Sequence, residues 1–236
     1  MSDLSRSHRF ASHSRLHSVN HAKLTFGVSQ PRVTMIVPRG LIAGLVVLST
    51  FLFAPGAHAQ SALVVALGDS NTAGYGVGRE NAFPARLQAM LRSDGYDVSV
   101  ANAGISGDTL RNMLARLDRY VPSGTRLVIV QGGYNDVMTG SSSAAIAASI
   151  EGILSRLATR RINTVLCGFF NRGWDAAGRT MAGKYGATLV DGSACYDPRY
   201  RGWDGLHMTV AGHQVVATRL RPRIEGMLAQ ATAAAR

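Results

Sequence analysis

The stretch LVVALGDS, residues 63–70, decides the fold of this chain. Its apolar run stops abruptly at Gly68, which is typical of a buried strand that turns sharply at its carboxyl end. Open α/β sheets bind their ligands at that end of their strands, so chemistry is expected near Ser70. Taken by itself, the segment leaves two interpretations of Ser70 open. It is either a nucleophile or the cap of a helix.

Strand-like and helical segments alternate along the rest of the chain. Apolar or β-branched runs cover residues 62–67, 97–101, 126–131, 163–168 and 187–190. Amphipathic stretches lie near 81–93, 108–120, 143–160 and 174–185, and a last one follows residue 209. This alternation predicts right-handed crossovers and a parallel sheet covered by helices on both faces. We therefore predict one α/β domain, a three-layer α/β/α sandwich with a five-stranded parallel sheet.

The N-terminal region indicates targeting rather than a part of the fold. Residues 41–53 are apolar throughout, but this run is short for a membrane span, which takes about 20 residues. The sequence AHA at 57–59 fits the small-x-small rule of signal peptidase, with cleavage before Gln60. We predict a signal peptide at 35–59, a folded domain at 60–236, and a periplasmic or secreted protein. An uncleaved membrane anchor is the alternative.

Residues 1–34 are rich in Ser, His and Arg and show little hydrophobic periodicity. Met35 and the residues after it already form a complete signal peptide, so we expect translation to start at Met35. Residues 1–34 are then a wrongly assigned or disordered extension. Most of the histidines would be discarded with the N-terminal region, namely His8, His13, His17, His21 and His58. A His-rich metal cluster is therefore not expected in the mature domain.

The formal net charge of +11 suggests nucleic-acid binding, but the distribution of the charge argues against it. Residues 60–236 hold nineteen Lys and Arg against thirteen Asp and Glu, and their basic residues are scattered arginines rather than a dense run. We expect a mildly basic, solvated surface and no nucleic-acid partner. Weak attraction to anionic envelope surfaces is the alternative.

Two segments that follow predicted strands offer donors for a developing negative charge. Gly107 can present a bare backbone N–H toward the end of the sheet, or it can belong to an ordinary turn with Asp108 as a helix cap. Asn135 can aim its amide at an oxyanion, or it can be an Asn chosen for turn geometry. Each segment, taken alone, leaves both interpretations open.

Asp204 and His207 stand just before the last predicted helix. Their spacing across a turn can put the carboxylate and the imidazole on one face, where the Asp accepts the Nδ1–H and leaves Nε2 as a base. His213 lies inside the predicted helix among apolar neighbours, so we interpret it as structural.

Two glycine-containing stretches only partly match phosphate-binding loops. Residues 71–78 (NTAGYGVG) fit neither the G-x-G-x-x-G pattern nor a P-loop, and we predict a mobile loop beside Ser70. Residues 178–184 spell the start of a P-loop, but Tyr185 occupies the place of the required Ser or Thr, and no strand precedes it. Nucleotide binding is therefore not expected.

Four segments thus occur in order: GDS at 68–70, Gly107, GYND at 133–136 and DGLH at 204–207. In sequence and in placement they resemble the motif blocks of the SGNH/GDSL hydrolase family, and the resemblance covers almost all of residues 62–230. The runs LGDSNTAGYGV and NAGISGDT are most similar to the subfamily of bacterial periplasmic thioesterase I/lysophospholipase and arylesterase. The resemblance implies a flavodoxin-like sandwich, which agrees with the fold class predicted from the alternation.

The resemblance also implies roles for individual residues. Ser70 would be the nucleophile, His207 the general base and acid, and Asp204 the group that orients His207. The oxyanion hole would consist of the backbone N–H groups of Ser70 and Gly107 and the side chain of Asn135. The resemblance implies no metal and no organic cofactor.

Two positions depart from the family pattern. Met208 stands where Pro often follows the His, and Tyr134 stands where the subfamily often has Gly. We expect the first to change the turn only locally, and the second to narrow or shape the acyl pocket.

The predicted reaction is hydrolysis of an acyl ester or thioester by a serine esterase, through an acyl-enzyme. The pattern G-x-S-x-G does not occur, which excludes the nucleophile elbow of α/β-hydrolases. A carbohydrate O-acetyl esterase, acting on an acetylated sugar, is the nearest alternative. A catalytically silent polysaccharide-binding domain is the third. We expect a monomer that meets the membrane only through its cleaved signal peptide.

Several aromatic residues lie in predicted loops or at a helix start, where they can line a sugar or acyl site or serve ordinary packing: Trp174, Tyr196, Tyr200 and Trp203.

The two cysteines lie near the ends of predicted strands. Cys167 ends the fourth predicted strand and Cys195 follows the fifth, so the two can meet at one edge of the sheet and form a disulfide in an exported protein. Two separate buried thiols are the alternative.

Overall fold

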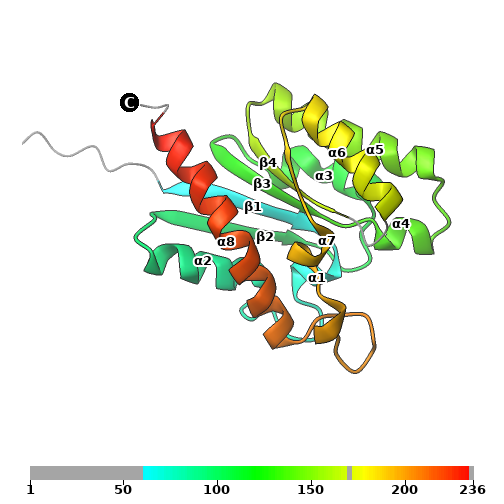
Figure 1. Cartoon of the computed structure of the whole chain (residues 1–236), viewed down its shortest axis with the longest axis horizontal. Helices are drawn as coiled ribbons and strands as arrows, with labels where there is room; N and C mark the ends of the chain where they lie inside the picture. The colour runs from blue at the N-terminus through cyan, green and yellow to red at the C-terminus, as the bar shows by residue number, and fades with distance from the viewer. Residues whose placement is uncertain (1–60, 169–171, 234–236) are drawn as a thin grey trace, which may run out of the picture. The chain divides into compact units, whose positions relative to one another are not determined.

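The computed structural model describes residues 61–168 and 172–233, all within one structural unit of the chain, Pro55–Arg236. The described part contains a five-stranded sheet with the order β2-β1-β3-β4-β5 (Figure 1). Its strands are β1 (Ala62–Gly68), β2 (Val98–Gly104), β3 (Thr125–Gln131), β4 (Asn163–Cys167) and β5 (Thr188–Val190). Every pairing in the sheet is parallel. The fold is the α/β sandwich that the sequence predicted.

Longer helices connect the strands and shorter ones follow several of them. The longer helices are α2 (Phe83–Ser93), α3 (Leu110–Tyr120), α5 (Ser143–Thr159), α6 (Arg172–Lys184) and α8 (Val210–Ala233). The shorter ones are α1 (Ser70–Ala73), α4 (Tyr134–Met138), α7 (Gly192–Cys195) and the 3-10 turn η1 (Pro198–Tyr200). The sequence predicted the longer helices, and their bounds agree within a few residues. It did not predict the short ones, because one turn of helix carries no readable periodicity.

The helices form one layer on each face of the sheet (Figure 1). Helices α2 and α8 pack on one face, where Phe83 and Leu220 belong to the same buried cluster. Helices α3 and α5 pack on the other face, where Met113 and Ile150 belong to a second cluster. The central strands contribute alternate side chains to both clusters. This two-sided burial explains why their sequences are apolar without interruption.

The order in which strands are added to the sheet changes side at β1. From β1 the chain first adds β2 on one side and then crosses to place β3 on the other. Gly68 pairs with Gly104 of β2 and with Gln131 of β3, so these three strands end at the same level. Their carboxyl ends flank the topological switch point, which is where open α/β sheets hold their ligands.

Several expectations lie outside the described residues. They include the signal peptide at 35–59, the start at Met35 and the extension at 1–34. Within the described residues, no helix is long and apolar enough to cross a membrane.

Candidate active site

Ser70 follows β1 directly and is the first residue of α1. Asp69 is the N-cap of that helix, and its side chain accepts a hydrogen bond from the backbone N–H of Asn71 at 3.0 Å. The helix cap is therefore Asp69, and Ser70 is free of that task. Gly68 is required before them, because a Cβ at this position would collide with the side chain of Thr72. The sharp strand-to-helix step places the Ser70 hydroxyl at the switch point of the sheet.

His207 links Ser70 to Asp204 by two hydrogen bonds. Nε2 of His207 lies 2.9 Å from Oγ of Ser70, and Nδ1 lies 2.6 Å from Oδ2 of Asp204. The hydrogen bond from His207 lowers the pKa of Asp204 to about 2. An ionised carboxylate can only accept, so Nδ1 carries the proton and Nε2 is left to accept the Ser70 proton. The chain of contacts has the order that activates a serine hydroxyl.

The loop between η1 and α8 fixes the geometry of Asp204 and His207. Oδ1 of Asp204 accepts the backbone N–H groups of Leu206 at 3.0 Å and of His207 at 2.9 Å. The backbone N–H of Met208 donates to Oδ1 of Asn71 at 3.2 Å. This last bond ties the residue after His207 to the residue after Ser70. Met208 stands where the family that the sequence resembles often has proline, and it donates a backbone N–H that a proline lacks.

Tyr75 is a neighbour of His207 that the sequence analysis missed. The two ring centroids lie 4.3 Å apart with an interplanar angle of 37°. Tyr75 lies five residues after Ser70, in the glycine-rich stretch that we interpreted only as a mobile loop. Its short separation from Ser70 in the sequence was the available signal for a place near the site. The ring faces an imidazole that becomes positively charged when it accepts the Ser70 proton, an arrangement that stabilises a cation.

Gly107 and Asn135 meet through the residue after Gly107. Nδ2 of Asn135 donates to the backbone carbonyl of Asp108 at 2.8 Å. Gly107 has a φ of +79°, a conformation that favours glycine. In the described part of the chain, no hydrogen bond joins either residue to Ser70. The structure thus places Asn135 next to the Gly107 loop, and the second hydrogen of the Asn135 amide does not take part in the bond to Asp108.

A half-buried arginine holds the Gly107 loop against the end of β1. Nε of Arg116 lies 2.6 Å from Oδ2 of Asp108, and Nη2 donates to the carbonyl of Gly68 at 3.1 Å. The N–H of Ile105 donates to that same carbonyl at 3.0 Å. The alternative in which Asp108 caps α3 is wrong, since Thr109 is the cap and the Asp108 carboxylate pairs with Arg116.

Ser70 and Asp204 line a cavity of about 840 Å³. Much of its wall is apolar and comes from Tyr134, Val137, Ile146, Tyr196, Pro198 and Leu206. The lining role expected of Tyr134 is therefore observed, and so is that of Tyr196. Of the described residues, Trp203 and Tyr200 do not line this cavity, and neither do Gly107 and Asn135. The side chain of Trp174 lies outside the described part.

Two buried ionisable side chains have shifted pKa values. Burial raises the pKa of Asp69 to about 6, although the Asn71 N–H opposes this shift. Burial also lowers the pKa of His213 to about 4. Nδ1 of His213 accepts the backbone N–H of Phe83 at 3.3 Å, which joins α8 to α2. His213 is thus a structural histidine, as the sequence indicated.

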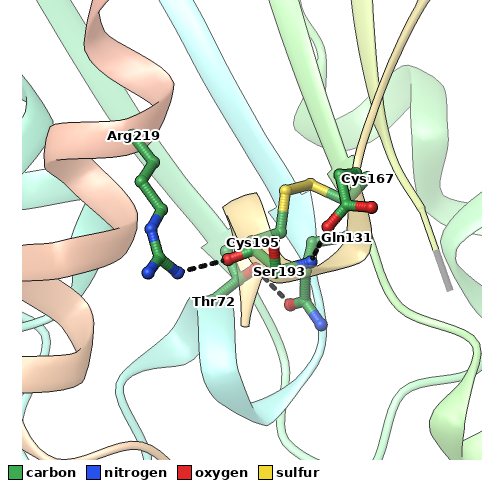
Figure 2. The surroundings of a disulfide bond; sticks show 7 residues. Thr72, Gln131, Cys167, Ser193, Cys195 and Arg219 are labelled. Carbon is green, nitrogen blue, oxygen red and sulfur yellow. Dashed lines mark hydrogen bonds between the residues drawn. A yellow bond between two sulfur atoms is a disulfide. The ribbon is translucent and has the colours of Figure 1, made fainter. Parts of the chain in front are cut away.

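Cys167 and Cys195 form a disulfide with an S–S distance of 2.02 Å (Figure 2). It joins the end of β4 to the end of α7. In Figure 2 the bond lies near Arg219, whose guanidinium donates to the Ser193 carbonyl. Tyr196 follows Cys195, and its hydroxyl donates to the carbonyl of Leu206 at 2.7 Å. The disulfide thereby anchors the start of the segment that carries Asp204 and His207.

Features of other ligand sites are not seen in the described residues. Within that part, no group of three or more His, Cys, Asp or Glu side chains is placed to hold a metal ion. Residues 178–184, which spell the start of a P-loop, lie inside α6 and form no phosphate-binding loop.

The comparisons with known proteins agree with this geometry. Residues 66–215 match the model of the GDSL-like Lipase/Acylhydrolase family. Among curated proteins, an arylesterase of Vibrio mimicus is 35% identical over 120 residues, which are 49% of this chain and 58% of that protein. Esterase TesA of Pseudomonas aeruginosa is 34% identical over 122 residues, 51% of this chain and 60% of that protein. The chain thus spans less than two thirds of both curated relatives.

The fold also matches solved structures. The crystal structure of AlinE4, an SGNH-hydrolase family esterase, is 31% identical and aligns with a TM-score of 0.56. The alignment covers 72% of this chain and 97% of that chain. The likeness extends over almost the whole of that protein.

Proposed function

This chain belongs to the GDSL-like lipase/acylhydrolase family, and on that basis we propose that it is a serine esterase acting on acyl esters or thioesters. The observation that carries the proposal is the contact chain from Ser70 through His207 to Asp204, with its distances of 2.9 and 2.6 Å. A serine hydroxyl needs such a base to become an effective nucleophile.

In the proposed reaction, Oγ of Ser70 attacks the substrate carbonyl while Nε2 of His207 takes its proton. The tetrahedral oxyanion accepts hydrogen bonds from the backbone N–H groups of Ser70 and Gly107 and from the Asn135 amide. His207 then protonates the leaving alcohol or thiol, which departs and leaves an acyl-enzyme at Ser70. A water molecule, deprotonated by His207, attacks the acyl-enzyme and releases the acid.

The cavity favours an acyl substrate over an acetylated sugar. Its wall holds Val137, Ile146 and Leu206, which suit a hydrocarbon chain better than sugar hydroxyls. We therefore place arylesterase-like, lysophospholipase-like or thioesterase-like activity ahead of carbohydrate O-deacetylation. We also propose export to the periplasm or medium, with the Cys167–Cys195 disulfide as support, since such bonds persist in oxidising compartments.

The test is hydrolysis of p-nitrophenyl esters from C2 to C12, with labelling by a fluorophosphonate probe. We expect Ser70→Ala to lower kcat on the order of 10⁴-fold or more and to abolish labelling, while the fold is retained. The matched control is Ser143→Ala, an exposed serine at the start of α5, which should behave as the wild type. Activity retained by Ser70→Ala would refute the nucleophile, and turnover of acetyl esters alone would favour the deacetylase.

A further inference from the structure

Tyr196 contacts the turn that carries Asp204 and His207 from outside that turn. Its hydroxyl donates a hydrogen bond to the backbone carbonyl of Leu206 at 2.7 Å. Tyr196 is buried, and burial raises the pKa of its phenol above the ordinary value of 10.0. The hydroxyl therefore stays protonated at neutral pH and can donate. Tyr196 thus holds a backbone carbonyl that lies between the two residues of the proposed triad.

The peptide unit that joins Leu206 to His207 is hydrogen-bonded on both of its sides. Its carbonyl accepts the Tyr196 hydroxyl, and its N–H, which belongs to His207, donates to Oδ1 of Asp204 at 2.9 Å. A peptide unit is planar, so a rotation of the carbonyl rotates the N–H by the same angle. The direction of the N–H that holds Asp204 therefore depends on the bond from Tyr196. The other carboxylate oxygen, Oδ2, lies 2.6 Å from Nδ1 of His207.

The preceding peptide unit is held less firmly. Its N–H, which belongs to Leu206, also donates to Oδ1 of Asp204, at 3.0 Å. Its carbonyl, which belongs to Gly205, accepts Nη1 of Arg201 at 3.2 Å. Arg201 is exposed, so water competes for that bond. Of the two peptide units that hold Asp204, the one bonded to Tyr196 has the shorter contact and the buried donor.

Tyr196 is itself anchored on both sides along the chain. The residue before it, Cys195, is bonded to Cys167 at the end of β4 (Figure 2). The residue after it, Asp197, is buried and lies 2.9 Å from Nη2 of Arg219 in α8. The backbone at Tyr196 is therefore fixed to the sheet by a covalent bond and to α8 by an ion pair. A hydroxyl on this anchored residue gives the turn a fixed point of attachment.

We propose that Tyr196 is a positioning residue, whose hydroxyl holds Asp204 in line with His207. The inference rests on the proposed esterase function. Without the hydroxyl, the 206–207 peptide unit can rotate and Asp204 can move away from Nδ1. His207 would then be oriented less accurately for taking the proton of Ser70, and the chemical step would slow. The ring of Tyr196 also lines the cavity, and it remains in a Phe variant.

The first test is Tyr196→Phe, which removes only the hydroxyl. We expect kcat for p-nitrophenyl esters to fall by about tenfold, since small displacements of catalytic groups have effects of this size. KM should stay unchanged, because the ring still lines the cavity. The rate of labelling by a fluorophosphonate probe should fall with kcat. The matched control is Tyr200→Phe, which also removes one tyrosine hydroxyl and does not alter the lining of the cavity.

A second test asks whether Tyr196 acts through Asp204. In an Asp204→Ala background, the carboxylate that the hydroxyl positions is absent. We therefore expect Tyr196→Phe to lower the residual kcat in that background by less than about twofold, whereas independent effects would multiply. A hydroxyl that contacts the substrate, or one that merely stabilises the fold, would cause the same fractional loss in both backgrounds.

A third test requires no turnover. The proton on Nδ1 of His207, in its 2.6 Å bond to Asp204, should give a signal at low field in the proton NMR spectrum. Asp204→Ala should abolish this signal, which assigns it. We expect the signal to move upfield and broaden in Tyr196→Phe, because the bond lengthens and its proton exchanges faster with water. Tyr200→Phe should leave the signal unchanged.

Any of three results would overturn the positioning role. They are a wild-type kcat in Tyr196→Phe, an equal fractional loss of kcat with and without the Asp204 carboxylate, and an unchanged low-field signal in Tyr196→Phe. The esterase proposal would survive each of them, because it depends on turnover by the wild type and its loss in Ser70→Ala. Conversely, a wild type that hydrolyses no ester would contradict the esterase, and the low-field signal would then decide the positioning role alone.

Discussion

Asn135 has an observed structural contact and a proposed chemical role. Its amide donates one hydrogen to the Asp108 carbonyl at 2.8 Å, which orients the group and leaves its second hydrogen outside that bond. The sequence left two interpretations of Asn135 open, turn geometry and oxyanion donor. The hydrogen bond to Asp108 supports the structural interpretation, and the oxyanion role stays a proposal that is compatible with it, because the bond occupies only one of the two amide hydrogens.

We expect Asn135→Ala to lower kcat by about 10²–10³ with a small change in KM, the usual loss for one oxyanion donor. Unfolding by urea should show a destabilisation of only about 1 kcal/mol from the lost hydrogen bond. The control is Asn112→Ala on α3, whose side chain is exposed. A wild-type kcat in Asn135→Ala would remove this residue from the oxyanion hole.

At the scale of elements, α3 positions the ends of β1 and β2. Arg116 reaches from α3 to Asp108 and to the carbonyl of Gly68, so its planar fork spans the two loops that carry Gly107 and Ser70. A lysine keeps the charge but cannot make both contacts in this geometry. The loops would then be positioned less accurately relative to each other.

We expect Arg116→Lys to lower kcat by ~10- to 100-fold, since a displacement of about 1 Å in a catalytic group can have that effect. KM should change little, which separates mispositioning from loss of substrate binding. Arg119→Lys, a turn further along α3, is the matched control and should leave kcat unchanged. Equal kcat values for wild type and Arg116→Lys would show that the loops hold their geometry without this fork.

The disulfide joins two elements, β4 and α7, through cysteines that are 28 positions apart in the sequence. We expect the double variant Cys167→Ser/Cys195→Ser to lose about 3 kcal/mol of unfolding free energy, from the greater freedom of its unfolded chain. Urea unfolding with and without reductant measures this. Reductant should destabilise the wild type by a similar amount and leave the double variant unchanged, which serves as the internal control.

At the scale of the whole molecule, the buried side chains of His213 and Asp69 make the free energy of unfolding depend on pH with opposite signs. The folded pKa of His213, about 4, lies below its ordinary value of 6.5, so the unfolded chain binds the proton first as the pH falls. Its contribution to stability is complete above pH 6.5 and is lost between 6.5 and 4. Asp69 has a folded pKa of about 6 against 3.8, so its contribution is complete below pH 3.8 and is lost as the pH rises through 6.

Between pH 4 and 6 the effects of His213 and Asp69 on the free energy of unfolding offset each other. Each effect is therefore measured as the difference in unfolding free energy between the wild type and a variant. We expect the stability advantage of the wild type over His213→Leu to shrink by about 3 kcal/mol as the pH falls from 6.5 to 4. The advantage over Asp69→Asn, which can still cap α1, should grow over the same range. Urea unfolding across pH 4–7 checks both signs, and a difference independent of pH would contradict the shifted pKa values.

The sequence by itself determined the architecture of this molecule. Uninterrupted apolar runs such as 63–67 can be buried only in a sheet covered on both faces, and their alternation with amphipathic stretches leaves one class of topology. The motif order also placed Ser70, Gly107, Asn135 and the Asp204–His207 pair at one edge, because parallel strands share their carboxyl ends.

Only the tertiary structure decided how these residues interact. That Asp69 rather than Ser70 caps α1, that Arg116 rather than a helix cap engages Asp108, and that Tyr75 stacks on His207 are contacts between loops. The physical reason is that sequence periodicity is a local property, whereas these contacts join segments that are distant in the sequence. Periodicity reports which face of an element is buried, whereas a hydrogen bond or ring contact depends on side-chain directions fixed to within tenths of an ångström by segments distant in sequence.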